Sequence, residues 1–322
     1  MQLDYPISTP QLRSLRSGAT LAPEPVAVFR VEGPGALTCL QGLLTCDLAA
    51  PGDASLSYGA LLTPKGMIVV DPWVLREADR FTLLLGAPAR EAAAQLLKRV
   101  LPPRLARLTD LSEEWGAAWL LGSAAVDRFA RANATPLPGV GRVVNLGNGR
   151  AGLLAGGTTL SPFSGLLLGP ATELTTLLER AEHAGMARGN GATLAAARVL
   201  AGWPTLGREI DERTLPQEVR FDELGAVSYV KGCYTGQETV ARVHFRGHVN
   251  RTLRGVKVAG ALPLSQRSLT LGDKDAGTIR TALLLEDHLL ALAVVRREVE
   301  ADVPLLAGDR EVNLVHLPVD PV

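Results

Sequence analysis

The octapeptide KGCYTGQE, residues 231–238, carries the residue types of a reactive thiol site. The apolar segment before it, residues 227–230, predicts a short strand, and the residues after it predict a helix that begins at Thr235. The positive end of a helix dipole stabilises a thiolate, and the ammonium group of Lys231 adds to that effect. The pattern therefore predicts that Cys233 is accessible and nucleophilic.

The same octapeptide also has a purely structural interpretation. Gly232 and Gly236 permit unusual backbone conformations and a close approach by a ligand, but glycines also form ordinary turns. Glu238 and Arg242 are spaced i,i+4, which suits a pair on a helix surface. A tight turn that holds a half-buried cysteine explains these residues as well as a reactive site does, so the local pattern leaves both open.

Basic residues are concentrated after the octapeptide. No Asp or Glu occurs from Thr239 to Gly272, whereas the loop at 209–223 is rich in acids. Clustered charge focuses potential even in a protein of zero net charge, so the segment predicts a local anion site. Polycarboxylates and nucleic-acid phosphates both fit, and solvated strand faces remain the alternative. The basic residues are Arg242, Arg246, Arg251, Arg254, Lys257 and Arg267.

The elements that must position these residues are short and mixed. Strands and helices do not alternate strictly, which favours an α+β fold over a doubly wound sheet. From residue 251 onward, short apolar runs between turns predict a small all-β domain, and residues up to 25 read as an irregular arm. We expect strands at 26–32, 81–85, 115–121 and 166–168, helices at 34–44, 87–101, 123–132, 171–184 and 194–202, and hairpins at 58–74 and 143–155.

Composition excludes several classes of protein. The 322 residues are 47% hydrophobic and 20% charged, which is enough apolar surface to rule out a disordered chain. The 33 basic residues equal the 33 acidic ones, so the basic surplus of a duplex-binding protein is missing. No apolar run approaches the ~18 residues that span a bilayer. Three cysteines without a signal peptide fit a reducing cytoplasm.

Three further patterns resemble motifs but favour structural interpretations. Residues 147–152 match G-x-G-x-x-G, yet no helix pattern follows, and Asn148-Gly149 predicts a hairpin turn instead. Cys39 and Cys46 lack the spacing of metal ligands, so we expect both on the buried face of a helix. His244 and His248 flank a glycine and have no adjacent glutamate, so no metal site is expected.

The sequence resembles the YgfZ family, whose signature is KGCYTGQETVAR followed by FRG. Three more blocks resemble that family: LQGLLTCD at 40–47, LLTPKG at 61–66 and LPQE at 215–218. Members of the family are folate-binding proteins related to the glycine-cleavage T-protein (GcvT, an aminomethyltransferase). They are implicated in the assembly or repair of iron–sulfur clusters.

The resemblance implies a three-part fold and a set of site residues. Two α+β lobes, residues 1–113 and 114–250, and a C-terminal β-barrel, residues 251–322, would surround a central cavity that binds tetrahydrofolate. Asp47 takes the place of the T-protein Asp beside the pterin, with Cys46 where that branch has Asn, and Cys233 is the family's signature thiol. The implied folate contacts are Lys231, Gly232, Tyr234, Gly236, Gln237, Glu238, Arg242, Arg246, Arg198 and Leu200.

One position departs from the family pattern. Relatives carry R-x-E-x-G on the helix before the long loop, where the Glu is expected to hold the pterin. Here the run is Arg198 to Gly202, RVLAG, and Leu200 replaces the acid. Leucine accepts no hydrogen bond, so the departure predicts weak folate binding that Leu200→Glu improves, and it argues against T-protein catalysis.

The preferred function is a tetrahydrofolate-binding accessory protein that supports the assembly or repair of iron–sulfur enzymes. The first alternative is an aminomethyltransferase, so whether the protein is an enzyme stays open, with the balance against it. The second alternative is an RNA-binding module, which ranks third because only Tyr234 and Phe245 lie near the arginines in sequence. We expect a cytoplasmic monomer with folate and iron–sulfur clients or assembly factors as partners, and neither membrane nor nucleic acid.

Overall fold

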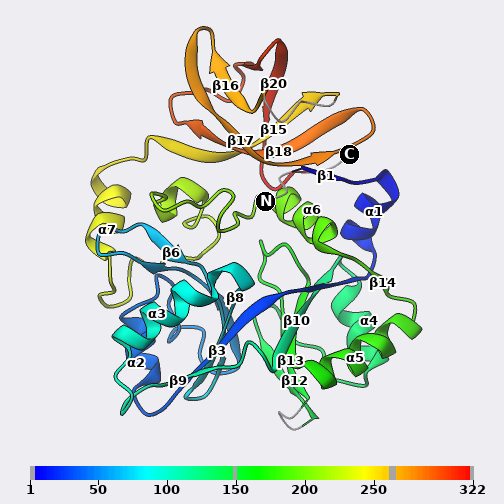
Figure 1. Ribbon diagram of the computed structural model, residues 1–322, viewed down its shortest axis with the longest axis vertical. Helices are drawn as coiled ribbons and strands as arrows, with labels where there is room; N and C mark the ends of the chain where they lie inside the picture. The colour runs from blue at the N-terminus through cyan, green and yellow to red at the C-terminus, as the bar shows by residue number, and fades with distance from the viewer. Residues whose placement is uncertain (1–3, 148–150, 261–265, 320–322) are drawn as a thin grey trace.

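The computed structural model describes residues 4–147, 151–260 and 266–319. Two mixed lobes lie side by side, and a β-barrel rests against both of them (Figure 1). Within the described residues, no helix is long and apolar enough to cross a membrane. The α+β class and the all-β C-terminal region that the sequence predicted are confirmed.

The first lobe is a five-stranded antiparallel sheet in the order β4-β7-β8-β3-β9, with α2 (Ala36–Gln41) and α3 (Arg90–Val100) packed on one face. Alternation along β3 divides its side chains between two cores: Phe29 faces the helices and Val28 faces the second lobe. The strands are β3 (Val26–Glu32), β4 (Ser55–Tyr58), β7 (Trp73–Glu77), β8 (Arg80–Gly86) and β9 (Arg107–Asp110), with the small hairpin β5 (Leu61–Leu62) and β6 (Ile68–Val70) beside them.

The second lobe is a six-stranded sheet in the order β11-β12-β13-β10-β2-β14. Phe129 of α4 (Ala125–Ala132) and Leu177 of α5 (Ala171–His183) pack against its outer face. Its inner face meets the first sheet in a shared apolar core. The strands are β2 (Thr20–Glu24), β10 (Trp115–Leu121), β11 (Val143–Leu146), β12 (Gly152–Gly156), β13 (Gly165–Pro170) and β14 (Ala187–Arg188).

Six antiparallel strands of the C-terminal region form the barrel, which closes through the pairing of β17 with β18. The helix α6 (Gly191–Ala201) lies directly below it and packs Val199 against barrel residues such as Leu283 (Figure 1). The strands are β15 (Arg251–Ala259), β16 (Ser268–Leu271), β17 (Lys274–Leu284), β18 (His288–Arg296), β19 (Leu305–Ala307) and β20 (Arg310–Val315).

The N-terminal segment is ordered, so the prediction of an irregular arm is wrong. The strand β1 (Asp4–Pro6) pairs with β17 of the barrel, and β2 pairs with β10 of the second lobe. Between them α1 (Thr9–Ser17) begins with a capping box in which Ser8 and Gln11 bond reciprocally. These residues therefore attach to the other two sheets, and the boundaries at 113 and 250 stay a prediction.

Three other predicted elements differ from the structure. Residues 227–230 form no strand, and the following helix, α7 (Gln237–Arg246), begins two residues later than the sequence suggested. The helix expected over 34–44 is shorter, since α2 begins at Ala36 and ends at Gln41, with Gly42 as its C-cap. The arms of the 143–155 hairpin, β11 and β12, pair as predicted, whereas the proposed turn at Asn148-Gly149 lies outside the described residues.

Aromatic rings fill the core between the two sheets. The rings of Trp73 and Trp203 stack with centroids 5.1 Å apart, and Tyr58 packs 4.7 Å from Trp203. The Tyr58 hydroxyl donates to Asp71 at 2.8 Å. Burial raises the pKa of Asp71 to about 6, although the Tyr58 hydrogen bond and Arg198 oppose the shift. The core between the two sheets is therefore a cluster of packed aromatic rings.

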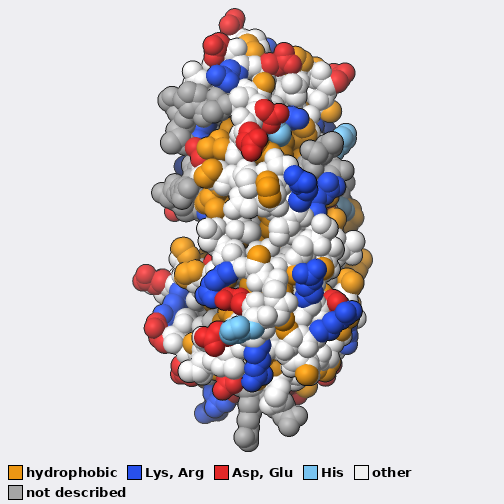
Figure 2. All heavy atoms as spheres, turned by 90° about the vertical axis from the view of Figure 1, so that its right-hand side faces the viewer, with side chains coloured by type: hydrophobic (Ala, Val, Ile, Leu, Met, Phe, Trp, Pro, Cys, Tyr) orange, Lys and Arg blue, Asp and Glu red, His pale blue; other side chains and the backbone are white. Residues whose placement is uncertain are grey.

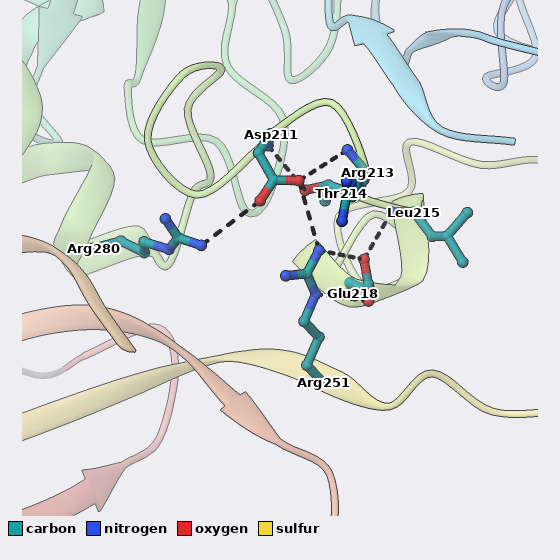
Figure 3. A network of polar contacts seen from close by, with 7 residues as sticks. All are labelled: Asp211, Arg213, Thr214, Leu215, Glu218, Arg251 and Arg280. Atoms are coloured by element: carbon teal, nitrogen blue, oxygen red, sulfur yellow. Dashed lines mark hydrogen bonds and ion pairs between the residues drawn. The ribbon is translucent and has the colours of Figure 1, made fainter. Parts of the chain in front are cut away.

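A polar network joins the loop after α6 to the barrel (Figure 3). Arg251 on β15 donates from Nε to Glu218 at 2.9 Å, and its Nη2 lies 3.6 Å from Asp211. Arg280 on β17 lies 3.7 Å from the same aspartate. Two acids of the loop that the sequence singled out, Asp211 and Glu218, are thus paired with arginines of the barrel.

Candidate functional site

The loop at 226–235 packs directly on the LQGLLTCD block of the first lobe. The Thr45 hydroxyl donates to the carbonyl of Ala226 at 2.6 Å, across 181 residues of sequence. The amide of Ser228 donates to the Thr45 carbonyl at 2.8 Å, and the amide of Thr235 donates to that of Gly42 at 3.1 Å. Two of the family blocks therefore form one surface.

The side chain of Lys231 anchors this loop to the first lobe through hydrogen bonds. Its Nζ donates to the carbonyls of Gln41, Leu44 and Cys46 at 2.8, 2.5 and 2.8 Å. It also lies 4.9 Å from the centroid of the Tyr234 ring. Burial lowers the pKa of Lys231 to about 8. All three ammonium protons are thus directed at backbone carbonyls, so Lys231 holds the loop in place rather than acting on Cys233.

The start of α7 packs against the LLTPKG hairpin. The helix is capped by Gly236 in the left-handed conformation, with φ 81°. A Cβ at this position would lie 2.6 Å from the carbonyl oxygen of Thr63 and 3.1 Å from the Cα of Gly66. Only glycine fits here, which explains the second glycine of the octapeptide and joins the third family block to the same surface.

The two glycines of the octapeptide should respond differently to alanine. Gly236→Ala forces an L-residue into the left-handed region and against a backbone carbonyl, so we expect a loss of at least about 1–3 kcal/mol of unfolding free energy. Gly232→Ala is the matched control, because its Cβ would meet no atom within 4 Å. Urea unfolding of both variants checks this, and equal losses would contradict the assigned geometry.

Of the three cysteines, Cys233 alone is exposed. The expectation that both of the others lie on the buried face of a helix is only partly met: Cys39 is on α2 but half-buried, and Cys46 is buried but lies beyond the end of that helix. Burial raises the pKa of the Cys46 thiol to about 12, although the nearby Lys231 ammonium opposes the shift. Cys233 is therefore the accessible thiol, and it precedes the first residue of α7, Gln237.

Asp47 presents an ionised carboxylate next to this loop. Its Oδ1 accepts hydrogen bonds from the side chain of Gln41 at 2.9 Å and from the amides of Ala49 and Ala50 at 2.8 and 3.1 Å. Burial favours the neutral acid, but these bonds outweigh it and lower the pKa of Asp47. All three bonds end on Oδ1, and no donor from the described part of the chain reaches Oδ2.

A pocket of about 480 Å³ opens at Asp47. Its walls come from residues 46–58 of the first lobe and from the loop at 224–230, with Thr158 of the second lobe. Tyr58 and Tyr229 line it, so two aromatic rings accompany the carboxylate. We call this cavity the Asp47 pocket; its size falls within the range of small-molecule sites.

The other predicted contacts are divided between this surface and the interior. Tyr234 is buried, with its pKa raised to about 12 by burial, and Gln237 is half-buried in the first turn of α7. The exposed positions of the set are Gly232, Glu238, Arg242 and Arg246. The sequence did not identify Tyr58 and Tyr229 as pocket residues. Tyr229 belongs to the segment 227–230, which the sequence predicted to be a strand.

Two predicted contacts on α6 are not brought to the Asp47 pocket. Arg198 forms a two-pronged ion pair with Glu24, at 3.1 and 3.0 Å. Leu200 is buried against the barrel and lines a separate cavity with Pro318 and Val319. That position 200 faces the pterin stays a prediction; in the structure this face of α6 packs on the barrel, and Leu200 is not among the residues that line the Asp47 pocket.

Two mixed lobes packed face to face, a closed antiparallel barrel and a pocket where the motif blocks meet define the GcvT-like fold. Residues 15–135 match the family model of the GCVT N-terminal domain. The structure is similar to that of the glycine cleavage system aminomethyltransferase T from Bartonella henselae, with a TM-score of 0.78 and 19% identity over 96% of this chain and 88% of that chain. At that identity, the likeness shows the fold alone.

Sequence relatives narrow this class to one family. The tRNA-modifying protein YgfZ of Edwardsiella ictaluri (strain 93-146) is 31% identical over 290 residues, which are 87% of this chain and 85% of the relative. The protein of the same name from Enterobacter sp. (strain 638) is 28% identical over 284 residues, 86% of this chain and 85% of the relative. The chain belongs to the YgfZ family, as its motifs indicated.

Proposed function

We propose that the protein binds tetrahydrofolate in the Asp47 pocket and acts as an accessory factor for iron–sulfur enzymes. The observation that carries the proposal is the Asp47 carboxylate, ionised and with Oδ2 open, in the wall of a pocket built partly by the loop that leads to Cys233. The fold and the family support it, because both point to a folate-handling scaffold.

The pocket has the chemistry that a pterin needs. A pterin ring is flat and presents neighbouring N–H donors on one edge, which a carboxylate accepts in charge-assisted hydrogen bonds. Of the two tyrosines that line the pocket, half-buried Tyr229 offers part of its ring as an apolar contact for the pterin, whereas Tyr58 is buried against Trp73 and Trp203. The hydroxyls of the two tyrosines bond to Asp71 and Asp222, which fixes the orientation of both rings before a ligand arrives.

Cys233 supplies the link to iron–sulfur chemistry. A stable cluster normally takes four thiolates, and this chain has three cysteines, of which only Cys233 is exposed. The protein therefore serves clusters transiently, by donating one thiolate ligand to a cluster whose other ligands come from a client. The relatives are named tRNA-modifying proteins, which supports a client enzyme that modifies tRNA.

The aminomethyltransferase alternative has weaker support. In the T-protein branch an Asn precedes the Asp beside the pterin, and here that position is Cys46, whose buried thiol lacks the hydrogen-bonding amide of an asparagine. A lipoyl-dependent transfer assay separates the two functions. We expect no turnover above background, and turnover that depends on Asp47 would favour the enzyme.

Calorimetric titration with tetrahydrofolate tests the binding step. Asp47→Asn removes the charge but keeps the shape, so we expect affinity to fall roughly 10- to 100-fold. Asp127→Asn, on the surface of α4, is the matched control and should bind like the wild type. Equal affinity of the wild type and Asp47→Asn, or no binding by the wild type, would contradict the proposal.

A further inference from the structure

Three aromatic rings form an exposed platform beside the Asp47 pocket. The His244 ring stacks on Tyr229 with centroids 3.7 Å apart and planes inclined by 19°. Phe245 meets both rings edge-on, at 4.7 and 5.8 Å, and is itself 67% exposed. Next in sequence to Tyr229, Val230 is 96% exposed. We call Tyr229, His244 and Phe245 the aromatic platform.

Hydrogen bonds hold the platform in place. The Tyr229 hydroxyl donates to Asp222 at 2.6 Å and accepts from Nε2 of Gln217 at 3.1 Å. The same Nε2 donates to the carbonyl of Val240 at 2.9 Å, which ties the tyrosine to α7. Burial and the hydrogen bond to Asp222 raise the pKa of Tyr229, so the ring stays neutral. A ligand thus meets a preformed surface.

Two unpaired arginines lie next to the platform on α7. Arg242 and Arg246 are exposed, and within the described residues neither arginine joins an ion pair or a side-chain hydrogen bond. The carboxylate of Asp222, next to the platform, already accepts from Tyr229 and lies 3.5 Å from His244. Positive charge at this surface is therefore free to attract an anion.

Another side of the molecule carries a different distribution of charge. The side of the molecule shown in Figure 2, away from α7, intermixes acidic and basic side chains with no field of one sign. The concentration of exposed arginine and aromatic residues at α7 is local, which is why zero net charge does not exclude it.

We propose that the aromatic platform and the arginines of α7 bind single-stranded RNA. An unpaired base stacks on the exposed Phe245, and the flanking phosphates pair with Arg242 and Arg246. An acidic protein partner would use the arginines but gains nothing from a rigid ring stack. The exposed side chains of His248 and Asn250, beyond the helix, offer hydrogen bonds to the 2′-hydroxyl that distinguishes RNA from DNA.

The structure removes the reason for which the sequence disfavoured nucleic acid. Of the two aromatic residues near the arginines in sequence, Tyr234 is buried, so it cannot stack on a base. Tyr229 was not counted because it lies farther away in sequence, and His244 was not counted because only Phe, Tyr and Trp were considered. Both rings lie next to Phe245 in the structure. The predicted anion site in this segment therefore gains the stacking partners that it lacked.

Fluorescence anisotropy with a labelled, unstructured single-stranded RNA of about ten nucleotides tests the inference, without folate present. Phe245→Ala should weaken binding about 5- to 100-fold through lost stacking. The double variant Arg242→Gln with Arg246→Gln should reduce the slope of log affinity against log salt by about 1.4. Controls are Leu137→Ala, an exposed apolar residue, and Arg180→Gln on α5.

Each outcome decides the matter independently of folate binding. Wild-type affinity in both platform variants, or no binding by the wild type at low salt, would overturn the inference. Equal binding of DNA with the same sequence would overturn the assignment to RNA. Loss of iron–sulfur support in cells by these variants, without any RNA binding in vitro, would assign the surface to a protein partner instead. Circular dichroism confirms that the variants are folded.

Discussion

Iodoacetamide should alkylate Cys233 before either of the other two cysteines. Cys233 is exposed, whereas burial shields Cys46 and raises its pKa to about 12. Near neutral pH this thiol forms a thiolate roughly a thousandfold less often than an ordinary cysteine does. Mass spectrometry of the modified peptides over a time course measures the order. Faster labelling of Cys39 or Cys46 would contradict the assigned site.

The same cysteine should decide activity in cells. In cells that lack the native protein, Cys233→Ser should fail to restore the activity of iron–sulfur enzymes, because no other exposed thiol replaces it. Cys39→Ser is the matched control and should restore it fully. Complete restoration by Cys233→Ser would show that the thiol is dispensable and would leave only the folate step of the proposed function.

Loss of Glu218 should have the largest effect on stability. Its side chain is 11% exposed and accepts from Arg251 at 2.9 Å and from the amide of Leu215 at 2.9 Å. Removing the carboxylate leaves the Leu215 amide and the partly buried Arg251 guanidinium, 32% exposed, without their nearest acceptor, so Glu218→Ala should lower the unfolding free energy by about 2–3 kcal/mol. Asp211 remains near Arg251 and moderates the loss.

Urea unfolding of matched variants measures this effect. Asp275→Ala is the control, because Asp275 pairs with Arg296 at the barrel surface, where both side chains are more than half exposed. Such pairs contribute less than about 1 kcal/mol. A loss of similar size in both variants would show that the network in Figure 3 does not hold the barrel to the lobes.

Elements with strong local patterns could be predicted from the sequence. The strands β3 and β10 occur at the predicted residues, since their apolar and β-branched side chains serve two cores. The strand β2 could not be predicted, because its sequence TLAPE contains a proline and its pairing with β10 depends on distant residues. The capping box at Ser8 and Gln11 was the one local signal for α1.

The candidate site, too, could be predicted only where it depends on local sequence. The motif blocks identified the surface, but the role of Lys231 depends on three carbonyls about 190 residues away, so its position next to Cys233 in sequence was misleading. Residues 227–230 alternate like a strand, yet bonds to Thr45 hold them as a loop. The position of Leu200 against the barrel likewise depends on packing between distant segments.

Hydrogen exchange with and without tetrahydrofolate tests the central claim, that the Asp47 pocket is the folate site, most directly. The ligand should slow exchange at residues 46–58 and 224–230, the two walls of the pocket, and this protection should be lost in Asp47→Asn. Protection confined to the cavity at Leu200, or no protection at saturating ligand, would contradict the claim.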